Sequence, residues 1–314
     1  MRTFNIILLA VIIASLVGVV WFIAENERSY LRADVNLSLS QPVPAHPPSS
    51  NQANKTKLRF GVAPVLSPQA TLKSYETLAA YMGERLGRPV ELVQGKNYTE
   101  MNALVRAGDV SLALVCSGAF VVGRWEFGME ALVIPVVNGQ KTYQSYLIVA
   151  SRSNVASWED LRQKTFAFTD TLSNTGRIVP VYTLSQMGET PEKFFKSTIF
   201  TYSHDKSIRA VADGLIDGAA VDSLAYDFVI KSDPALAART KVIWKSPPYG
   251  INPIVVNPNV SPELRQKFKS ILLGMSNESE GMEILKHLGI DTFAKPDVSA
   301  YDAIEDMIRV TGLK

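Results

Sequence analysis

A polar turn at residues 170–176 carries side chains that could bind an anion. It lies in "TDTLSNTGRIVPVY" (169–182), between the β-like run "TFAFT" and an apolar segment. The first N–H groups of a helix lack partners within the helix, and the helix dipole is positive there. A tetrahedral oxyanion can accept these groups together with hydroxyls. We therefore expect Ser173 to cap the helix, Thr175 to add a hydroxyl and Gly176 to let a ligand approach the backbone; an ordinary serine cap is the alternative.

Three further polar side chains stand at positions where they could face the same ligand. His204, in "YSHD", follows Ser203 at the start of another expected helix, which would double the supply of donors. A single histidine is otherwise more often a structural hydrogen-bonding group. Tyr98 and Tyr143 are phenols that can donate to an oxyanion. Tyr98 begins a helix-like segment, so a core aromatic is an equal alternative there.

The sequence offers little for catalysis or metal binding. One cysteine and three histidines allow no disulfide within the chain and no metal cluster of usual spacing. Cys116 lies in the apolar run "SLALVCSGAF", which indicates a packed thiol rather than a nucleophile. GxSxG, HExxH, GxxxxGK[ST] and CxxC do not occur. We therefore predict a binding protein rather than an enzyme, with no cofactor.

Composition supports a globular protein outside the nucleic-acid-binding class. The 314 residues are 46% hydrophobic and 20% charged, with a net charge of +2. Lysine and arginine form no dense stripe, so we expect no nucleic-acid partner. A chain of this length can form two lobes with separate cores.

The N-terminal segment indicates a membrane anchor. Residues 4–24 carry no charge and are long enough to span a bilayer core, which takes about 20 residues. The run is longer than a signal-peptide core and lacks a good cleavage site. We predict an uncleaved anchor with its juxtamembrane segment at 1–33, and everything after residue 24 on the extracytoplasmic side. Residues 34–57, rich in Pro, Ser, Asn and Gln, are predicted to be a disordered linker.

From residue 58 onward, short β-like runs alternate with helical periodicity. We expect strands at 58–63, 89–94, 110–116, 131–137, 146–151, 165–169, 196–202, 217–222, 240–246 and 252–257. We expect helices at 71–87, 98–109, 118–128, 157–162, 204–213, 261–273, 279–287 and 299–311, and one after the polar turn. Asp222 looks like a cap or turn residue.

This alternation predicts an α/β fold of two doubly wound lobes with parallel sheets. The chain would cross between the lobes near 143–151 and return near 245–256. The first lobe would comprise 58–145 and 247–314, and the second 146–246. Ligands of such folds lie in the cleft, outside the carboxyl ends of the strands.

Five segments in order resemble the phosphonate-binding periplasmic proteins, the receptors of phosphate, phosphite and phosphonate ABC importers. They are "NYTEMNALVRAGDVSLALV", "YQSYLIVASRSNVASWEDL", "FTDTLSNTGRIVPVY", "YSHDKSIRAVADGLIDGAAVDS" and "VIWKSPPYGINPIVV". Each is weak alone, but their order and spacing are specific. The resemblance covers about residues 58–290 and implies the type II periplasmic-binding fold.

The resemblance also implies which side chains bind the ligand: Tyr98, Tyr143, Ser173, Asn174, Thr175, His204 and Asn252. Asn174 departs from the family's Ser-Thr-Ser run. Asn252 falls where aminophosphonate binders carry an aspartate, and Leu224 falls where an acid would be expected. The loss of these acids disfavours a ligand amine and favours a simpler oxyanion.

The resemblance therefore implies a monomeric, extracytoplasmic solute-binding protein that delivers a small phosphorus oxyanion to an ABC permease. The alternative is a membrane-anchored sensing module that reports ligand occupancy to a signalling protein in the membrane. An uncleaved anchor favours this alternative, because importer receptors are usually released or linked to lipid.

Overall fold

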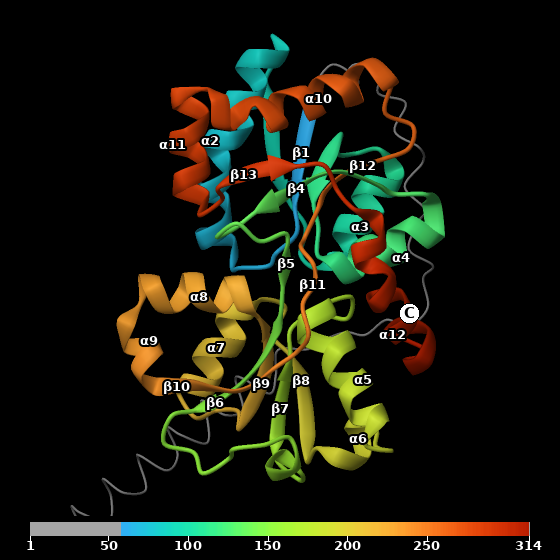
Figure 1. Ribbon diagram of the computed structural model, residues 1–314. Helices are drawn as coiled ribbons and strands as arrows, with labels where there is room; N and C mark the ends of the chain where they lie inside the picture. The colour runs from blue at the N-terminus through green and yellow to red at the C-terminus, as the bar shows by residue number, and fades with distance from the viewer. Residues whose placement is uncertain (1–57, 314) are drawn as a thin grey trace, which may run out of the picture. The chain divides into compact units, whose positions relative to one another are not determined.

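Two mixed β-sheets and a two-stranded ribbon organise residues 58–313, the part of the chain that the computed structural model describes (Figure 1). The predicted anchor and linker lie outside these residues. Within 58–313, no helix is long and apolar enough to cross a membrane.

The first sheet has the strand order β13-β4-β12-β3-β1-β2. Its strands are β1 (Leu58–Val62), β2 (Val90–Gln94), β3 (Leu112–Leu114), β4 (Glu130–Val136), β12 (Ile254–Val256) and β13 (Thr292–Ala294). β1 pairs in parallel with β2 and β3. β12 is antiparallel to both β3 and β4, and β13 is antiparallel to β4.

The second sheet has the strand order β10-β6-β9-β7-β8. Its strands are β6 (Ser145–Ala150), β7 (Thr165–Phe168), β8 (Ser197–Phe200), β9 (Gly218–Asp222) and β10 (Thr240–Lys245). β7 is parallel to β8 and β9, whereas β6 is antiparallel to β9 and β10. The ribbon pairs β5 (Thr142–Tyr143) with β11 (Tyr249–Gly250), and both strands run between the two sheets (Figure 1).

The expectation of parallel sheets is wrong, because both sheets are mixed. The strand that follows each crossing, β6 in the second sheet and β12 in the first, is antiparallel to both of its neighbours. β1, β3, β7 and β9 end where the two sheets approach each other. β6 and β12 instead begin there, each directly after the chain has crossed from the other sheet. A strand that enters a sheet from that end must be antiparallel to one that leaves it there.

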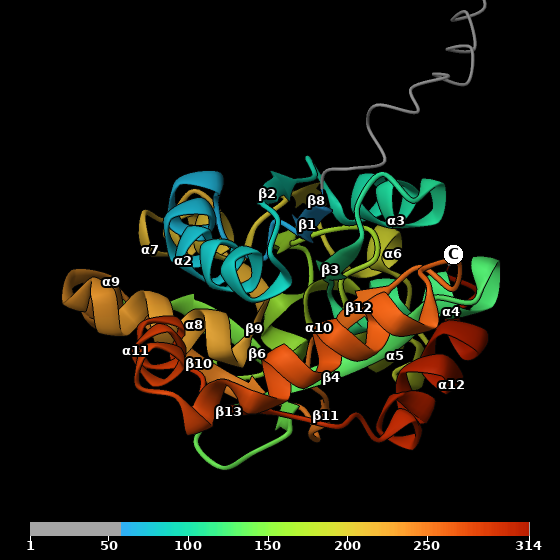
Figure 2. The same cartoon turned by 90° about the horizontal axis from the view of Figure 1, so that it is seen from above.

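Six helices pack with the first sheet: α2 (Pro68–Leu86), α3 (Tyr98–Ala107), α4 (Ser117–Phe127), α10 (Pro262–Gly274), α11 (Ser279–Leu288) and α12 (Asp302–Thr311). The helices α2, α10 and α11 lie beside one another over the first sheet (Figure 2). They share one core with it, in which Met82, Phe268 and Leu285 are buried. A second core buries Val105 of α3, Phe120 of α4 and Ile304 of α12. α12 also contacts α5, so it links elements of both sheets.

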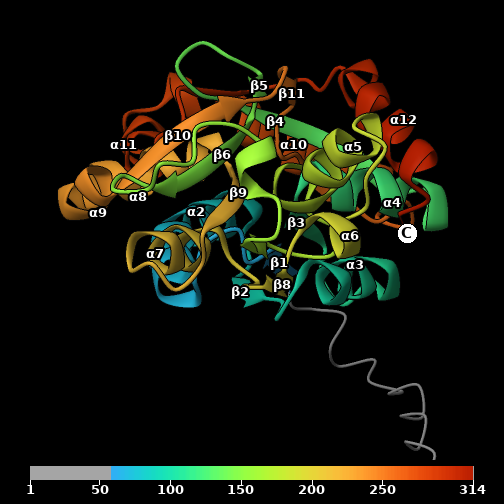
Figure 3. The same cartoon turned by 90° about the horizontal axis from the view of Figure 1, so that it is seen from below.

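Five helices accompany the second sheet: α5 (Val179–Gln186), α6 (Pro191–Phe194), α7 (His204–Ala212), α8 (Ser223–Ser232) and α9 (Pro234–Arg239) (Figure 3). A one-turn 3-10 helix (Glu159–Leu161) replaces the helix expected at 157–162. A π-helical turn (Asn174–Ile178) leads into α5. The helices α6, α8 and α9 and the strands β5, β11 and β13 were not predicted from the sequence.

Candidate functional site

The candidate site lies where strand ends of the two sheets face each other. The segments after β1 and β3 come from the first sheet, and those after β7 and β9 come from the second. Hydrogen bonds join the two sides: His204 N donates to Val65 O at 3.0 Å, and Ser67 N donates to Asp205 Oδ1 at 2.9 Å. All the predicted binding residues except Asn252, which is partly exposed, are buried.

The polar turn forms a capped helix start. Ser173 Oγ accepts a hydrogen bond from Gly176 N at 3.0 Å, as expected for a cap. The backbone oxygen of Thr175 accepts one from Ser145 Oγ at 2.7 Å, which ties the turn to β6. The side-chain Oγ1 of Thr175 is buried and has no hydrogen-bond partner in the described part of the chain.

The structure gives Gly176 a packing role, and its expected role of letting a ligand approach the backbone stays a prediction. A Cβ at this position would lie 2.4 Å from Thr169 Oγ1 and 2.9 Å from Ser173 Oγ. Side chains of the protein therefore occupy the space beside this glycine. Gly176 is needed for internal packing of the turn.

Tyr143 and Asn174 meet at the ribbon. Tyr143 Oη lies 2.5 Å from Ser117 Oγ at the start of α4, and Asn174 Nδ2 donates to the same phenol at 3.3 Å. Burial raises the pKa of the Tyr143 phenol well above its usual value, so the group stays protonated. Asn174 Oδ1 is buried without a partner. The contact brings together residues from both sheets.

Tyr98 is a core aromatic, which is one of the two interpretations of its position, and its role in ligand binding stays a prediction. Its ring is buried in the core beside α3, and its backbone N–H donates to Asp170 Oδ2 at 3.1 Å. Its hydroxyl is buried and unpaired. Burial, with the nearby Cys116 thiol and Asp170, raises the pKa of this phenol, so it is a neutral donor.

His204 is a neutral imidazole at the start of α7. Its Nδ1 accepts a hydrogen bond from Asp222 N at 3.0 Å and lies 3.1 Å from Thr169 Oγ1. Burial lowers its pKa to about 3. Because Nδ1 accepts, the ring proton is on Nε2, which is the group that can donate to a ligand. The preceding residue, Ser203, has a buried Oγ without a partner.

Asn252 is fixed between the two sheets by both atoms of its amide. Its Oδ1 accepts from Ser117 N at 3.0 Å, and its Nδ2 donates to Asp222 Oδ2 at 3.2 Å. Asp222 caps α8, as expected, by accepting from Leu224 N and Ala225 N. Burial raises the pKa of Asp222 to about 6. A carboxylate therefore stands beside Asn252, although the sequence argument found no acid for this part of the cleft.

Four buried polar atoms of this region have no hydrogen-bond partner among the residues that the structure describes: Tyr98 Oη, Asn174 Oδ1, Thr175 Oγ1 and Ser203 Oγ. We call them the unpaired cluster. A buried polar group without a hydrogen bond costs about 1–3 kcal/mol, and natural proteins keep few of them. Three of the four belong to residues that sequence analysis predicted to bind a ligand. Ser203 was missed, although its place before His204 at a helix start was a usable signal.

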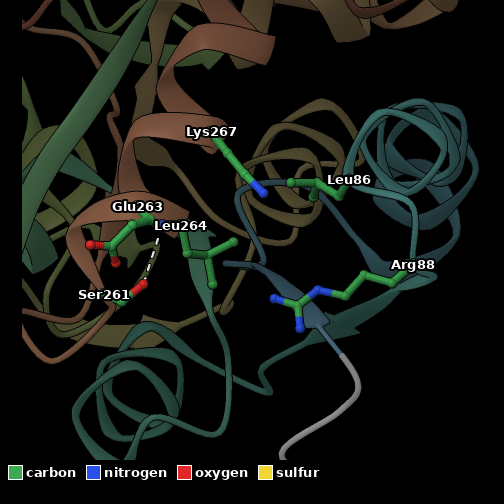
Figure 4. A pocket seen from close by; sticks show the side chains of 6 residues that line it. All are labelled: Leu86, Arg88, Ser261, Glu263, Leu264 and Lys267. Carbon is green, nitrogen blue, oxygen red and sulfur yellow. Dashed lines mark hydrogen bonds between the residues drawn. The ribbon is translucent and has the colours of Figure 1, made fainter.

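A pocket of about 330 Å³ opens beside Asn252 and Asp222. Its wall is mainly apolar and includes Leu224 and Phe228 from α8 and Ile254 from β12. A second pocket of about 300 Å³ lies at the start of α10, between Arg88 and Lys267 (Figure 4). The Ser261 hydroxyl there already caps Leu264 N, and none of the predicted site residues lines this pocket.

The start of α4 touches the polar turn at Gly118. A Cβ on Gly118 would lie 2.4 Å from Leu172 O and 3.0 Å from Asn174 N. Cys116, two residues before Gly118, is buried as predicted, and burial raises its pKa to about 11. Backbone from the first sheet and backbone from the second therefore approach each other directly at this glycine.

Comparison with known proteins identifies the family. The family model that matches residues 60–301 is described as "ABC transporter, phosphonate, periplasmic substrate-binding protein". The phosphate-import protein PhnD of Mycolicibacterium smegmatis is 30% identical, over 66% of this chain and 70% of that protein. The phosphonates-binding periplasmic protein of Escherichia coli is 27% identical, over 78% of this chain and 73% of that protein.

A crystal structure shares the fold. It is that of a binding protein component of an ABC phosphonate transporter from Pseudomonas aeruginosa, with a TM-score of 0.77 and 25% identity. The match covers 82% of this chain and 86% of that one. The chain therefore has a periplasmic-binding-protein fold and belongs to the family of periplasmic substrate-binding proteins of phosphonate ABC transporters, as its motifs predict.

Proposed function

We propose that this protein binds a small phosphorus oxyanion, namely phosphate, phosphite or a short alkylphosphonate, and delivers it to an ABC importer. The observation that carries the proposal is the unpaired cluster beside His204. The names of the relatives support the ligand class, because one imports phosphate and another binds phosphonates. Within this family of binding proteins, catalysis is not expected.

The available donors match a tetrahedral anion. The hydroxyls of Tyr98, Thr175 and Ser203 and the Nε2–H of His204 would each donate one hydrogen bond. A half-turn of the Asn174 amide would add a fifth donor, since Tyr143 could then donate to Oδ1 while Nδ2 faces the ligand. All five donors are neutral, so hydrogen bonds rather than ion pairs would hold the charge.

Access to this site would require motion between the sheets. The four atoms of the unpaired cluster are inaccessible to solvent. We propose two lobes, residues 58–145 with 247–314 and residues 146–246, that separate by bending at the β5–β11 ribbon. Hinge closure around a ligand is a usual response of two-lobed binding proteins.

Calorimetry on the purified full-length protein tests the ligand class. Phosphate, phosphite and methylphosphonate would be titrated in parallel with sulfate, methanesulfonate and acetate. We expect at least one phosphorus ligand to bind more tightly than any of the others. Binding of sulfonates or carboxylates with no response to the phosphorus ligands would overturn the proposal.

A sensing role is the second candidate, and the uncharged segment at 4–24 favours it. An uncleaved anchor would keep the protein, a monomer in this proposal, at the extracytoplasmic face of the membrane, beside a signalling partner. Intact-mass spectrometry of the protein from membranes should then give the full 314-residue mass. A mature N-terminus near residue 25 would instead favour a secreted importer receptor. Permease and ATPase genes beside this one would also favour transport.

A further inference from the structure

The two carboxylate oxygens of Asp222 differ in the number of hydrogen bonds that they accept. Oδ1 accepts from Leu224 N at 2.8 Å and from Ala225 N at 3.1 Å. Within residues 58–313, Oδ2 accepts one hydrogen bond, from Asn252 Nδ2 at 3.2 Å. A carboxylate oxygen can accept about two hydrogen bonds. The side chain is only 2% exposed, so bulk water does not readily supply the missing donor.

The surroundings of Asp222 contain no cation to balance a second negative charge. Among the described residues, Asp222 forms no ion pair with lysine or arginine. The titratable groups that face it are Asp227 on its own helix, Tyr98 on α3, Cys116 at the start of α4, Tyr143 on β5 and His204 on α7. Lys231 lines the adjacent pocket but is exposed at its rim.

These neighbours are neutral or acidic. Burial keeps the phenols and the thiol protonated and the imidazole uncharged. A fully ionised oxyanion near Asp222 would therefore place acceptor against acceptor in a buried environment, where like charges strongly disfavour each other. A proton between the two oxygens removes this conflict.

We propose that Asp222 makes the site selective for an oxyanion that carries an ionisable proton, which the ligand donates as a P–OH hydrogen bond to Asp222 Oδ2. This inference rests on the proposed function. Carboxylate and ligand together hold one proton in the complex, so a dianion from solution takes up one proton on binding. A sulfonate has the same shape as a phosphonate but no such proton near neutral pH, so Asp222 itself must take up a proton before a sulfonate can bind. Above the pKa of Asp222 this requirement weakens sulfonate binding.

Methylphosphonate and methanesulfonate form the matched pair of probes. For the full-length protein, we expect methylphosphonate to bind at least about tenfold more tightly than methanesulfonate at pH 8, where Asp222, with a pKa of about 6, is almost entirely ionised. Above the second pKa of the ligand, its affinity should fall by about tenfold per pH unit, since each complex needs one proton.

The test variant is Asp222→Asn, which keeps a good helix cap. Its amide can donate to a dianion, so the preference for methylphosphonate should shrink at least tenfold and the pH dependence should flatten. Asp227→Asn is the control, because it removes a nearby carboxylate that makes no hydrogen bond to Asn252. D227N should keep both the preference for methylphosphonate over methanesulfonate and the fall in affinity with rising pH.

Each alternative outcome has a distinct meaning. If both variants and the natural protein show the same preference and slope, Asp222 does not share the ligand's proton and the inference fails. It also fails if D222N weakens only 2-aminoethylphosphonate, because Asp222 then pairs with a ligand amine. If no phosphorus oxyanion binds to any of the proteins, the proposed function itself fails, and this inference with it.

Discussion

Replacing Thr175 by valine should change stability and ligand affinity in opposite directions. The two side chains have nearly the same shape, and Thr175 Oγ1 is buried without a partner in the protein. Valine removes this unsatisfied hydroxyl, so in the absence of ligand the free energy of unfolding should rise, by up to about 2 kcal/mol. For a domain of this size, 1 kcal/mol raises Tm by roughly 2–4 °C.

Ligand binding should become weaker in the same variant. A hydrogen bond from a hydroxyl to a charged oxyanion contributes about 1.5–3 kcal/mol. Its loss should therefore weaken methylphosphonate or phosphite binding by about 10- to 100-fold, measured by titration calorimetry. Thermal unfolding of the same sample, without ligand, gives the stability change.

Thr240→Val is the matched control in the second sheet. Thr240 is also buried, but its Oγ1 donates to Leu236 O at 3.0 Å and contacts Tyr226 Oη at 3.0 Å. This change should lower stability by about 1–3 kcal/mol and leave affinity unaltered. The reasoning is refuted if T175V lowers stability as T240V does while affinity stays the same, because Thr175 would then be an ordinary buried hydroxyl.

Three further predictions concern neighbouring residues. Asn252→Asp would put a second carboxylate 3.2 Å from Asp222 Oδ2, so calorimetry at pH 8 should show at least tenfold weaker binding of a simple oxyanion; unchanged affinity would mean that Asn252 does not face the ligand. The folded-state pKa of His204 is about 3, below the ordinary value of about 6.5, so only the unfolded state takes up this proton as the pH falls and stability is lost between these values. Urea unfolding should therefore show His204→Asn gaining roughly 2 kcal/mol relative to the natural protein between pH 7 and pH 5, and no relative gain would argue against a buried neutral imidazole. Gly176→Ala should cost about 1–3 kcal/mol in thermal unfolding because its Cβ would overlap Thr169, whereas Gly274→Ala, with open space around it, should stay within about 0.5 kcal/mol; equal effects would contradict the packing argument.

Elements with strong periodicity were predicted well from the sequence. Strands such as β9 and helices such as α4 and α7 lie within one or two residues of their predicted bounds. The helix α8 was missed because the residues around its start, "VDSL" (221–224), resemble a turn, and Asp222 does cap it. Strand direction was also missed, since it depends on which end of a sheet the chain enters and not on local residue pattern.

The candidate site was only partly accessible to sequence reasoning. Ser173 could be assigned as a cap because serine before a helix has a local signature. The contact between Asn252 and Asp222 spans 30 residues and joins the two sheets, so no local pattern reveals it. No local pattern reveals the packing role of Gly176 either, because the position of Thr169 beside it depends on the path of the chain after β7. The binding role of the predicted residues stays a prediction until it is measured.

The direct backbone approach at Gly118 offers a way to change ligand affinity separately from ligand preference, although mutations in a binding site usually change both. Alanine at this position would act as a spacer: its methyl group would meet Leu172 O, which cannot move aside as a flexible side chain can. In the two-lobe motion proposed above, the spacer would raise the free energy of bringing the lobes together without removing any ligand donor. Affinity could therefore be lowered in graded steps while the order of preference among ligands is kept. In a biosensor built on this protein, Gly118 would set the concentration range, and the polar residues would set which compound is detected.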